Sequence, residues 1–254
     1  MNQKKTLFFA ASALMLVASF LATPKAKAET APGEGFYTGA FIGYGSGLVS
    51  AKVVSFGRVG GTGGGLNSDG TFESKRGGLG LGGIQGGGWA GWGMKTADDL
   101  YFGAEVSGAG SDEKFQITTS DALRLQDTQT DITSITAQRM WTAGGALRVG
   151  YYVNSDTLFS LKGGVAISQF DVEIGSNSNS YYAGGPQMGG SIETKLSKLD
   201  PNLSLRMEFV YTNYLTANVL AKTGQVQSGS GTGGGTAELT GHDSAGRIGV
   251  QYSF

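Results

Sequence analysis

The stretch Arg247–Phe254, RIGVQYSF, carries the pattern that decides the fold. Every second residue in it is apolar or aromatic: Ile248, Val250, Tyr252 and Phe254. Strict alternation of this kind predicts a β-strand with one apolar face and one polar face. A terminal segment usually frays unless it is paired or docked. We therefore predict that this final strand pairs with another strand of a sheet.

The same alternation recurs through the chain. In Leu203–Thr212, LSLRMEFVYT, the odd-numbered positions are apolar or aromatic, and Ser204, Arg206 and Glu208 lie on the other face. Similar segments follow this pattern clearly at 100–108, 139–153 and 158–168, and more weakly at 35–44, 79–92 and 190–199. With the final strand they make eight predicted strands. Glycines obscure the alternation in 35–44 and 79–92, so the sequence leaves the facing of these two strands open.

The connections between the predicted strands alternate in length. Three are short and rich in Asn, Asp, Ser or Pro, as tight turns require: KTADD, NSDT and LDPN. The other four are long and polar or Gly-rich, at about 45–77, 110–134, 175–189 and 219–241. This alternation is typical of an up-and-down antiparallel barrel whose short turns all lie on one side of a membrane. We predict an all-β transmembrane barrel with four long external loops and three short periplasmic turns.

The composition of the two strand faces indicates which face meets lipid. The polar faces carry isolated charges among Gly, Ala and Ser, which suits a narrow lumen better than a charge-dense solvent face. Aromatic residues gather near the predicted strand ends, as in the girdles of membrane barrels: Phe36, Tyr44, Trp92, Phe102, Trp141, Tyr151, Phe159, Tyr211 and Tyr252. We therefore predict that the apolar faces point outward to lipid.

The lumen of such a barrel should contain paired charges, because an isolated charge in a narrow interior is costly. The predicted interior ion-pair network consists of Glu105, Arg148, Lys162, Arg206, Glu208 and Arg247, with Glu193 and Lys195 as further candidates. One interpretation is a structural network that fills the barrel. The alternative is a set of ion pairs that gates a narrow pore for small solutes.

The bulk composition excludes several classes of function. The net charge of −1 provides no basic field for nucleic acid. The absence of cysteine excludes disulfides, and one histidine with no cysteine gives no metal-binding constellation, so no cofactor is predicted. Gly is abundant, with 45 residues, and small inward residues would leave room for long charged side chains.

The first residues of the sequence have the pattern of an export signal. Lys4 and Lys5 precede an apolar run from about Leu7 to Ala22, and Ala26 and Ala28 follow at the spacing of a cleavage site. We predict a signal peptide at 1–28 and a barrel domain at 29–254. An exported chain whose strands are predicted to span a membrane is expected in an outer membrane.

Seven stretches resemble one known family: FYTGAFIGYG, LGGIQGGGWAGW, YFGAEVSG, GGALRVGYYV, LFSLKGGVAIS, LSLRMEFVYT and RIGVQYSF. In order and character they are similar to the outer-membrane β-barrel domain family, of the opacity-protein-like and small "porin family" type. This family is related in architecture to the transmembrane domain of outer membrane protein A. The resemblance implies that Tyr252 and Phe254 form a signal read by the barrel-assembly machinery.

The most direct functional interpretation is a non-enzymatic surface protein. Its loops are expected to contact host, phage or neighbouring molecules, and its other partners would be outer-membrane lipids and, during biogenesis, the barrel-assembly machinery. We expect a monomer. A less favoured alternative is a lipid-A-modifying hydrolase at His242 and Ser244, which share a strand face two residues apart.

Overall fold

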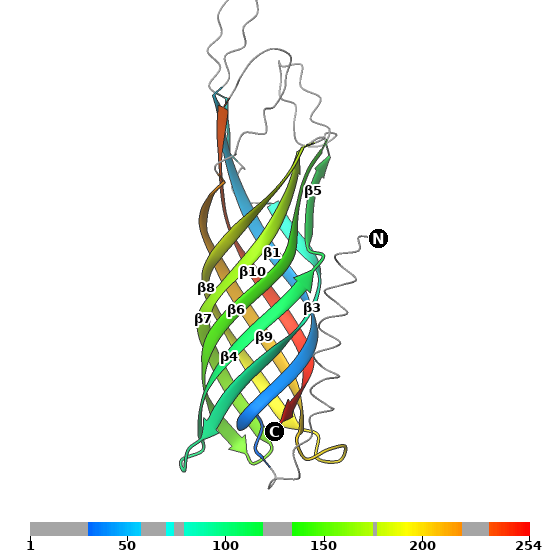
Figure 1. Ribbon diagram of the computed structural model, residues 1–254, viewed down its shortest axis with the longest axis vertical. Helices are drawn as coiled ribbons and strands as arrows, with labels where there is room; N and C mark the ends of the chain where they lie inside the picture. Colours follow the sequence, from blue (N-terminus) through cyan, green and yellow to red (C-terminus); the bar gives the residue numbers. More distant parts are fainter. Residues whose placement is uncertain (1–29, 57–69, 74–78, 119–133, 175–176, 220–233) are drawn as a thin grey trace, which may run out of the picture.

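The computed structural model describes residues 30–56, 70–73, 79–118, 134–174, 177–219 and 234–254. The predicted signal peptide at 1–28 lies outside these residues. The described chain forms ten strand segments that enclose a tall barrel with tilted walls (Figure 1). They are β1 (Gly35–Phe56), β2 (Gly70–Glu73), β3 (Leu79–Lys95), β4 (Leu100–Ser111), β5 (Lys114–Thr118), β6 (Ser134–Asn154), β7 (Thr157–Ile174), β8 (Asn177–Lys195), β9 (Leu203–Val219) and β10 (Gly234–Ser253).

The wall is a closed antiparallel sheet of eight strands. Each strand pairs with its neighbour along the chain, and β10 pairs with β1 from Tyr37↔Ser253 to Phe56↔Gly234. Two of the eight are interrupted, because β2 and β3 pair in turn with β1, while β4 and β5 pair in turn with β6. The predicted eight-stranded up-and-down barrel is confirmed. The described ranges contain no helix that is long and apolar enough to span a membrane.

The predicted facing of the strands also holds. On β9, Met207 and Phe209 are exposed on the outside, whereas Arg206 and Glu208 are buried in the lumen. The structure also settles the Gly-rich strands: the lumen receives Tyr37 and Phe41 from β1, and Gln85 and Trp89 from β3. Gly39 shows why glycine suits such a wall, since a Cβ there would lie 2.5 Å from the Trp89 indole nitrogen.

The three short connections lie together at the end of the barrel where the chain finishes (Figure 1). They follow β3, β6 and β8, at 96–99, 155–156 and 196–202. Asp99 has a positive φ of 59°, a conformation that Asp tolerates better than most side chains. We refer to this end as the short-turn mouth.

The long loops are shorter in the structure than the sequence predicted, because the strands extend into them. Strand pairing continues into 45–56, 70–73, 110–118 and 234–241, and the predicted loop 175–189 lies almost entirely in β8, which starts at Asn177 opposite Ile174 of β7. These segments are polar and Gly-rich, but ladder hydrogen bonds come from the backbone, so a paired neighbour can extend a strand through poor strand-forming residues. The remaining parts of these loops lie outside the described residues.

The far half of the wall divides into two ribbons. The β8–β9 ladder ends at Gln187↔Thr212 although both strands continue, and the next residue, Pro186, has no N–H to donate. On the opposite side the β3–β4 ladder ends at Gln85↔Ser111. Beyond it, among the described residues, the Asp112 amide donates to the Ile84 carbonyl at 3.0 Å and the single pair Gly82↔Lys114 links β3 to β5. Above these two points one ribbon contains β2, β1, β10 and β9, and the other contains β5, β6, β7 and β8.

Candidate functional site

The lumen contains two groups of buried charged residues at different heights. The upper triad, where the two ribbons separate, consists of Glu113, Arg139 and Asp243. The central charge cluster, nearer the short-turn mouth, consists of Glu105, Arg148, Lys162, Glu193, Arg206, Glu208 and Arg247. All ten side chains are buried, so their geometry decides what the lumen can do.

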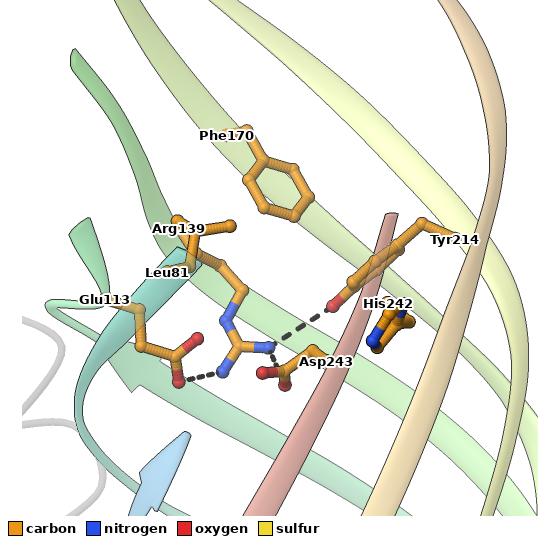
Figure 2. A pocket seen from close by; sticks show the side chains of 7 residues that line it. All are labelled: Leu81, Glu113, Arg139, Phe170, Tyr214, His242 and Asp243. Atoms are coloured by element: carbon orange, nitrogen blue, oxygen red, sulfur yellow. Dashed lines mark hydrogen bonds and ion pairs between the residues drawn. The ribbon is translucent and has the colours of Figure 1, made fainter. Parts of the chain in front are cut away.

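Arg139 is the centre of the upper triad (Figure 2). Its Nη1 donates to Asp243 Oδ2 at 2.5 Å and to the Tyr214 hydroxyl at 3.3 Å, and its Nη2 donates to Glu113. Because Arg139 lies on β6 while Asp243 and Tyr214 lie on β10 and β9, these bonds join the two ribbons. The Ser168–Tyr214 hydroxyl pair at 2.8 Å adds a second link.

Glu113 is the residue of the triad that does not belong to a strand. It lies in the break between β4 and β5, and its neighbours Asp112 and Lys114 are exposed. Burial raises the pKa of the Glu113 carboxyl to about 7, the Arg139 guanidinium opposes this rise, and the negative charge of Asp243 adds to it. The triad has two carboxylates for one guanidinium, so the second carboxylate adds to the effect of burial on the pKa of Glu113.

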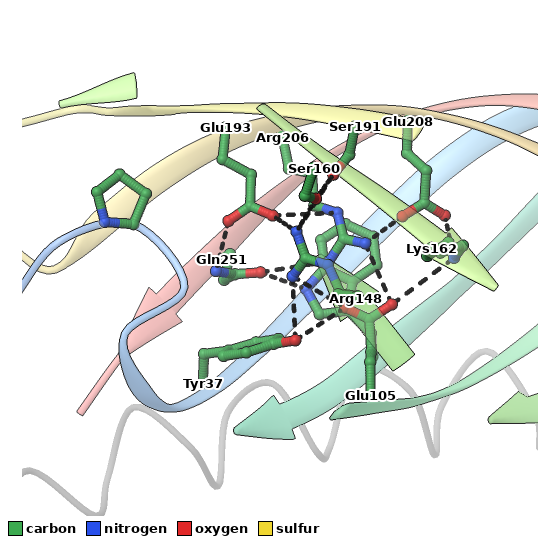
Figure 3. Close-up of polar contacts among 12 residues, drawn as sticks. Tyr37, Glu105, Arg148, Ser160, Lys162, Ser191, Glu193, Arg206, Glu208 and Gln251 are labelled. Carbon is green, nitrogen blue, oxygen red and sulfur yellow. Dashed lines mark hydrogen bonds and ion pairs between the residues drawn. The ribbon is translucent and has the colours of Figure 1, made fainter. Parts of the chain in front are cut away.

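In the central charge cluster Arg206 forms ion pairs with all three carboxylates (Figure 3). Its two terminal nitrogens reach the two oxygens of Glu105 at 2.5 and 3.1 Å, and Nη2 also donates to Glu208. Its guanidinium carbon lies 4.4 Å from the centre of the Trp89 ring. A bidentate ion pair with an aromatic face behind it is the geometry that arginine, but not lysine, can make.

Arg148 forms the layer nearest the short-turn mouth. Its Nη2 donates to Glu193 and, at 2.8 Å, to Ser160 Oγ, while its Nη1 donates to the Tyr37 hydroxyl at 3.0 Å. Its guanidinium carbon lies 5.2 Å from the Tyr101 ring. The guanidinium is therefore enclosed by hydrogen-bond acceptors and aromatic rings from several strands.

Lys162 and Arg247 share one carboxylate. Lys162 Nζ lies 2.7 Å from Glu208 Oε1, and Arg247 Nη1 lies 3.2 Å from the same oxygen. Arg247 Nη2 donates to Gln85 at 3.2 Å, and the Phe41 ring lies 4.6 Å from its guanidinium carbon. Sharing of carboxylates means that no single pair can be removed without affecting the rest.

The structure brings all six residues of the predicted network into this cluster and adds Glu193, which pairs with Arg148 and accepts from Gln251 at 3.0 Å. Lys195, the other further candidate for the ion-pair network, lies at the last position of β8. The upper triad was not predicted. Glu113 falls in the predicted loop at 110–134, and no role was predicted for Asp243. Asp243 lies four residues before Arg247 in the same strand. The alternation that points Arg247 into the lumen could therefore have predicted that Asp243 points inward too.

The two groups balance each other in charge. The central cluster has four cationic side chains and three carboxylates, and the upper triad has one cation and two carboxylates. With all ten groups ionised, each group alone would leave one net charge in the lumen, whereas together they are neutral. Charges buried in a filled interior need partners of opposite sign, and this arrangement provides them.

Among the side chains that the structure describes, no carboxylate is bonded to the alternative catalytic pair. His242 and Ser244 lie on the outward side of β10, and the His242 ring lies 5.7 Å from that of Tyr211. Asp243 between them points into the lumen, where Arg139 holds it. Glu238, expected in a loop, is part of β10. Within the described residues there is no cluster of three or more His, Cys, Asp or Glu that could bind a metal ion.

Tyr252 and Phe254 lie at the closing seam of the barrel. Their ring centres are 5.3 Å apart, and the Phe254 amide donates to the Phe36 carbonyl at 2.9 Å. The last residue is therefore tied to the start of β1. Its role as an assembly signal stays a prediction.

No protein-family model matches the chain, and no curated protein matches it in sequence. Among solved structures it is similar to Ail, the attachment invasion locus protein of Yersinia pestis, at 8% identity and a TM-score of 0.35, over 84% of this chain and 99% of that one. It is similar to Neisserial surface protein A at 14% identity and a TM-score of 0.42, over 87% and 98%. It is also similar to the outer membrane protease OmpT of Escherichia coli at 10% identity and a TM-score of 0.43, over 89% and 98%. Identities and scores this low assign no activity, so the function must be argued from the residues of this chain.

Proposed function

We propose that the chain is an outer-membrane β-barrel whose filled lumen makes it a structural and surface protein. One observation carries the proposal. The outward positions of the eight strands within 36–48, 84–94, 100–110, 141–153, 159–169, 182–194, 203–215 and 242–254 contain no Asp, Glu, Lys or Arg. All charged side chains at these heights point inward. A soluble barrel has the opposite arrangement.

The size and borders of this outer band support a membrane location. Leu147, Ile42 and Val165 are 69%, 67% and 65% exposed in its middle, where water would make such surface costly. Aromatic side chains border the band on both sides, among them Phe36, Trp92, Phe102 and Phe159 toward the short-turn mouth and Tyr44 and Tyr182 toward the ribbons. Spanning strands need about 9–11 residues, which these ranges supply. The short-turn mouth would then face the periplasm.

The filled lumen favours a structural role over transport. A solute would have to cross the central charge cluster, in which Arg148, Arg206 and Glu193 are fully buried and bonded to partners from several strands. The two ribbons would stand on the external side as a rigid base for the segments that connect their strands. Binding usually resides in such segments, and contact with host, phage or neighbouring molecules is the proposed role.

The proposed barrel is not an enzyme and acts as a monomer in contact with outer-membrane lipids. The carboxylate beside His242 and Ser244 is held on the opposite side of the strand by Arg139, so it cannot orient the imidazole. Lipid-A mass analysis of a deletion strain tests this point, and a lost modification would establish the enzyme instead.

The membrane location is tested by the depth at which a charge is tolerated. Leu147→Arg puts a cation in the middle of the apolar band, and Asn154→Arg puts one at the exposed β6–β7 turn of the same strand. In a lipid-facing wall the first should cost about 2–4 kcal/mol and the second about 0–1 kcal/mol. Urea unfolding in lipid vesicles measures both. A Leu147→Arg variant as stable as Asn154→Arg would contradict the proposal.

A gated pore is the second candidate, and the shared carboxylates favour it. Glu208 contacts Lys162, Arg206 and Arg247, so cations could exchange partners without becoming unpaired. Planar-bilayer recordings distinguish the two candidates. The structural proposal expects the wild-type protein to be silent, whereas steady channels that are lost or altered in Lys162→Met would establish the pore.

A further inference from the structure

A tight turn precedes the first strand at the short-turn mouth. The Glu34 amide donates to the Ala31 carbonyl at 3.0 Å, which closes a turn with Pro32 and Gly33 at its centre. Gly33 has a φ of +74°, as the third residue of a type II turn requires, and proline is favoured at the second. The Ala31 amide donates to the Glu34 carboxylate at 3.2 Å, so the turn is a compact unit.

This turn is inserted into the mouth of the barrel. Pro32 is less than 2% exposed, although it lies outside every strand. Ala31 packs against Tyr101, Tyr152 and Leu158, three buried lumen residues of β4, β6 and β7. The Tyr152 hydroxyl donates to the Pro32 carbonyl at 2.8 Å. A Cβ on Gly33 would lie 3.2 Å from the Tyr101 ring and 3.3 Å from Leu158, so the turn and its seat fit closely.

The turn covers the central charge cluster from below. The Tyr101 ring, on which Gly33 rests, is the ring that lies 5.2 Å from the Arg148 guanidinium. Tyr101, Tyr152 and Leu158 thus form one layer between the turn and the charges. Residues 31–34 form the next layer, nearest the medium outside the mouth.

The turn is held differently from the wall it closes. Among the described residues, its ties to the barrel are the Tyr152 bond, one rim contact of Thr30 with Asn202 at 3.3 Å, apolar packing, and the close approach of the Gly33 carbonyl to Gly93 of β3. It joins β1 through Gly35, whose φ of +74° marks a point where the backbone changes direction. Breaking these few contacts would free the turn and leave the strand ladder intact.

We propose that residues 31–34 are a plug that seals the short-turn mouth and swings out as a unit about Gly35, exposing the Tyr101–Tyr152–Leu158 layer to water. The barrel then has a closed and an open form at this mouth with no change in its strands. The plug is independent of the membrane location, because its contacts are all internal, and its test can be done on protein folded in detergent.

Cysteine reactivity tests the plug without interference, because the chain has no cysteine of its own. Two reporters lie on opposite sides of the contact: Leu158→Cys in the seat and Pro32→Cys on the plug. Each is alkylated with a small water-soluble maleimide, and Asp156→Cys in the exposed β6–β7 turn gives the unprotected rate. The mobility of unheated and heated protein on gels verifies that each variant is a folded barrel.

The expected result has two parts. Both reporters should react far more slowly than Cys at 156 and at rates equal to each other, because one opening exposes both. Tyr152→Phe removes one hydrogen bond and should accelerate both reporters by up to roughly tenfold. Gly33→Val, a β-branched residue at positive φ, should accelerate Cys at 158 further, while Cys at 156 stays unchanged.

Three outcomes would overturn the proposal. If Cys at 32 reacts quickly while Cys at 158 stays protected, the turn frays without uncovering a seat. If Cys at 158 reacts as fast as Cys at 156 in the otherwise unchanged chain, the mouth is not sealed. If Gly33→Val and Tyr152→Phe leave both rates unchanged in folded barrels, the turn does not control access.

Discussion

Glu105 is a single buried carboxylate that several donors in the lumen share. It accepts hydrogen bonds from Arg206, Arg148 and the Tyr37 hydroxyl, at distances between 2.5 and 3.4 Å, and none of these donors has access to bulk water. Buried charges such as these contribute little net stability when paired, but removal of one partner leaves the others uncompensated. The cost of a substitution here is thus the cost of the charges left behind.

Glu105→Ala should therefore destabilise the barrel by about 3–5 kcal/mol. Asp156→Ala, in an exposed turn, is the matched control and should change stability by less than about 0.5 kcal/mol. The free energy of unfolding in urea, measured in detergent, gives both values. Equal stability of the two variants would mean that the central charge cluster does not hold the barrel.

Glu113 should make the stability depend on pH. Its folded pKa of about 7 lies above the ordinary 4.5, so the folded state holds the proton more tightly than the unfolded chain. This contribution is fully present below pH 4.5 and is lost as the pH rises toward 7, by at most roughly 3 kcal/mol. Urea unfolding between pH 4.5 and 7.5 measures the slope. Glu113→Gln should flatten it, and an unchanged slope in that variant would assign it to other groups.

At the scale of the elements, the fork between β8 and β9 divides one strand into two environments. Below Gln187↔Thr212, β9 has a ladder partner on each side, and above this point its pairing with β8 stops at Pro186. Backbone amides without a ladder partner exchange with solvent through smaller openings. The fork therefore marks a local change in stability along β9.

Amide hydrogen exchange should reveal this change. The amides of 213–215 should exchange faster than those of 205–211 in the same strand, because the latter are paired with both β8 and β10. The matched comparison is the facing stretch of β10, 242–250, which is paired along both edges. Uniform protection along β9 would mean that the wall stays closed above Thr212.

The elements also show what the sequence could predict. Alternation predicted the inward direction of Arg148, Arg206 and Glu208, because in a strand a residue's parity fixes its face. It could not predict how far strands extend, since the backbone ladder of β8 continues through Asn, Ser and Gly that have weak strand preference. Partners across the lumen, such as Arg139 with Asp243, depend on barrel register and lie beyond any local pattern.

At the scale of the whole molecule, the last residue closes the barrel. The Phe254 amide donates to the Phe36 carbonyl at 2.9 Å. The sequence resemblance predicts that this aromatic ending also directs assembly. Phe254→Ser keeps the backbone bond but removes the aromatic ring. We expect less protein in the outer-membrane fraction while its synthesis stays normal. Quantitative blotting of total and membrane fractions measures this, Ser253→Ala is the control, and a parallel loss in that control would remove the special role of the ring.

The seam between β1 and β10 has a consequence for how the molecule folds. Tyr37 and Ser253 pair although they lie at opposite ends of the chain, whereas every other seam joins strands that are neighbours in sequence. Contacts of such high contact order carry the largest loop-closure entropy and form slowly. Until that last seam forms, the curled sheet has two open edges, and open edges are where chains aggregate. We therefore expect the barrel to be most prone to aggregation before this seam closes, and a catalyst that holds both edges at once would shorten that period.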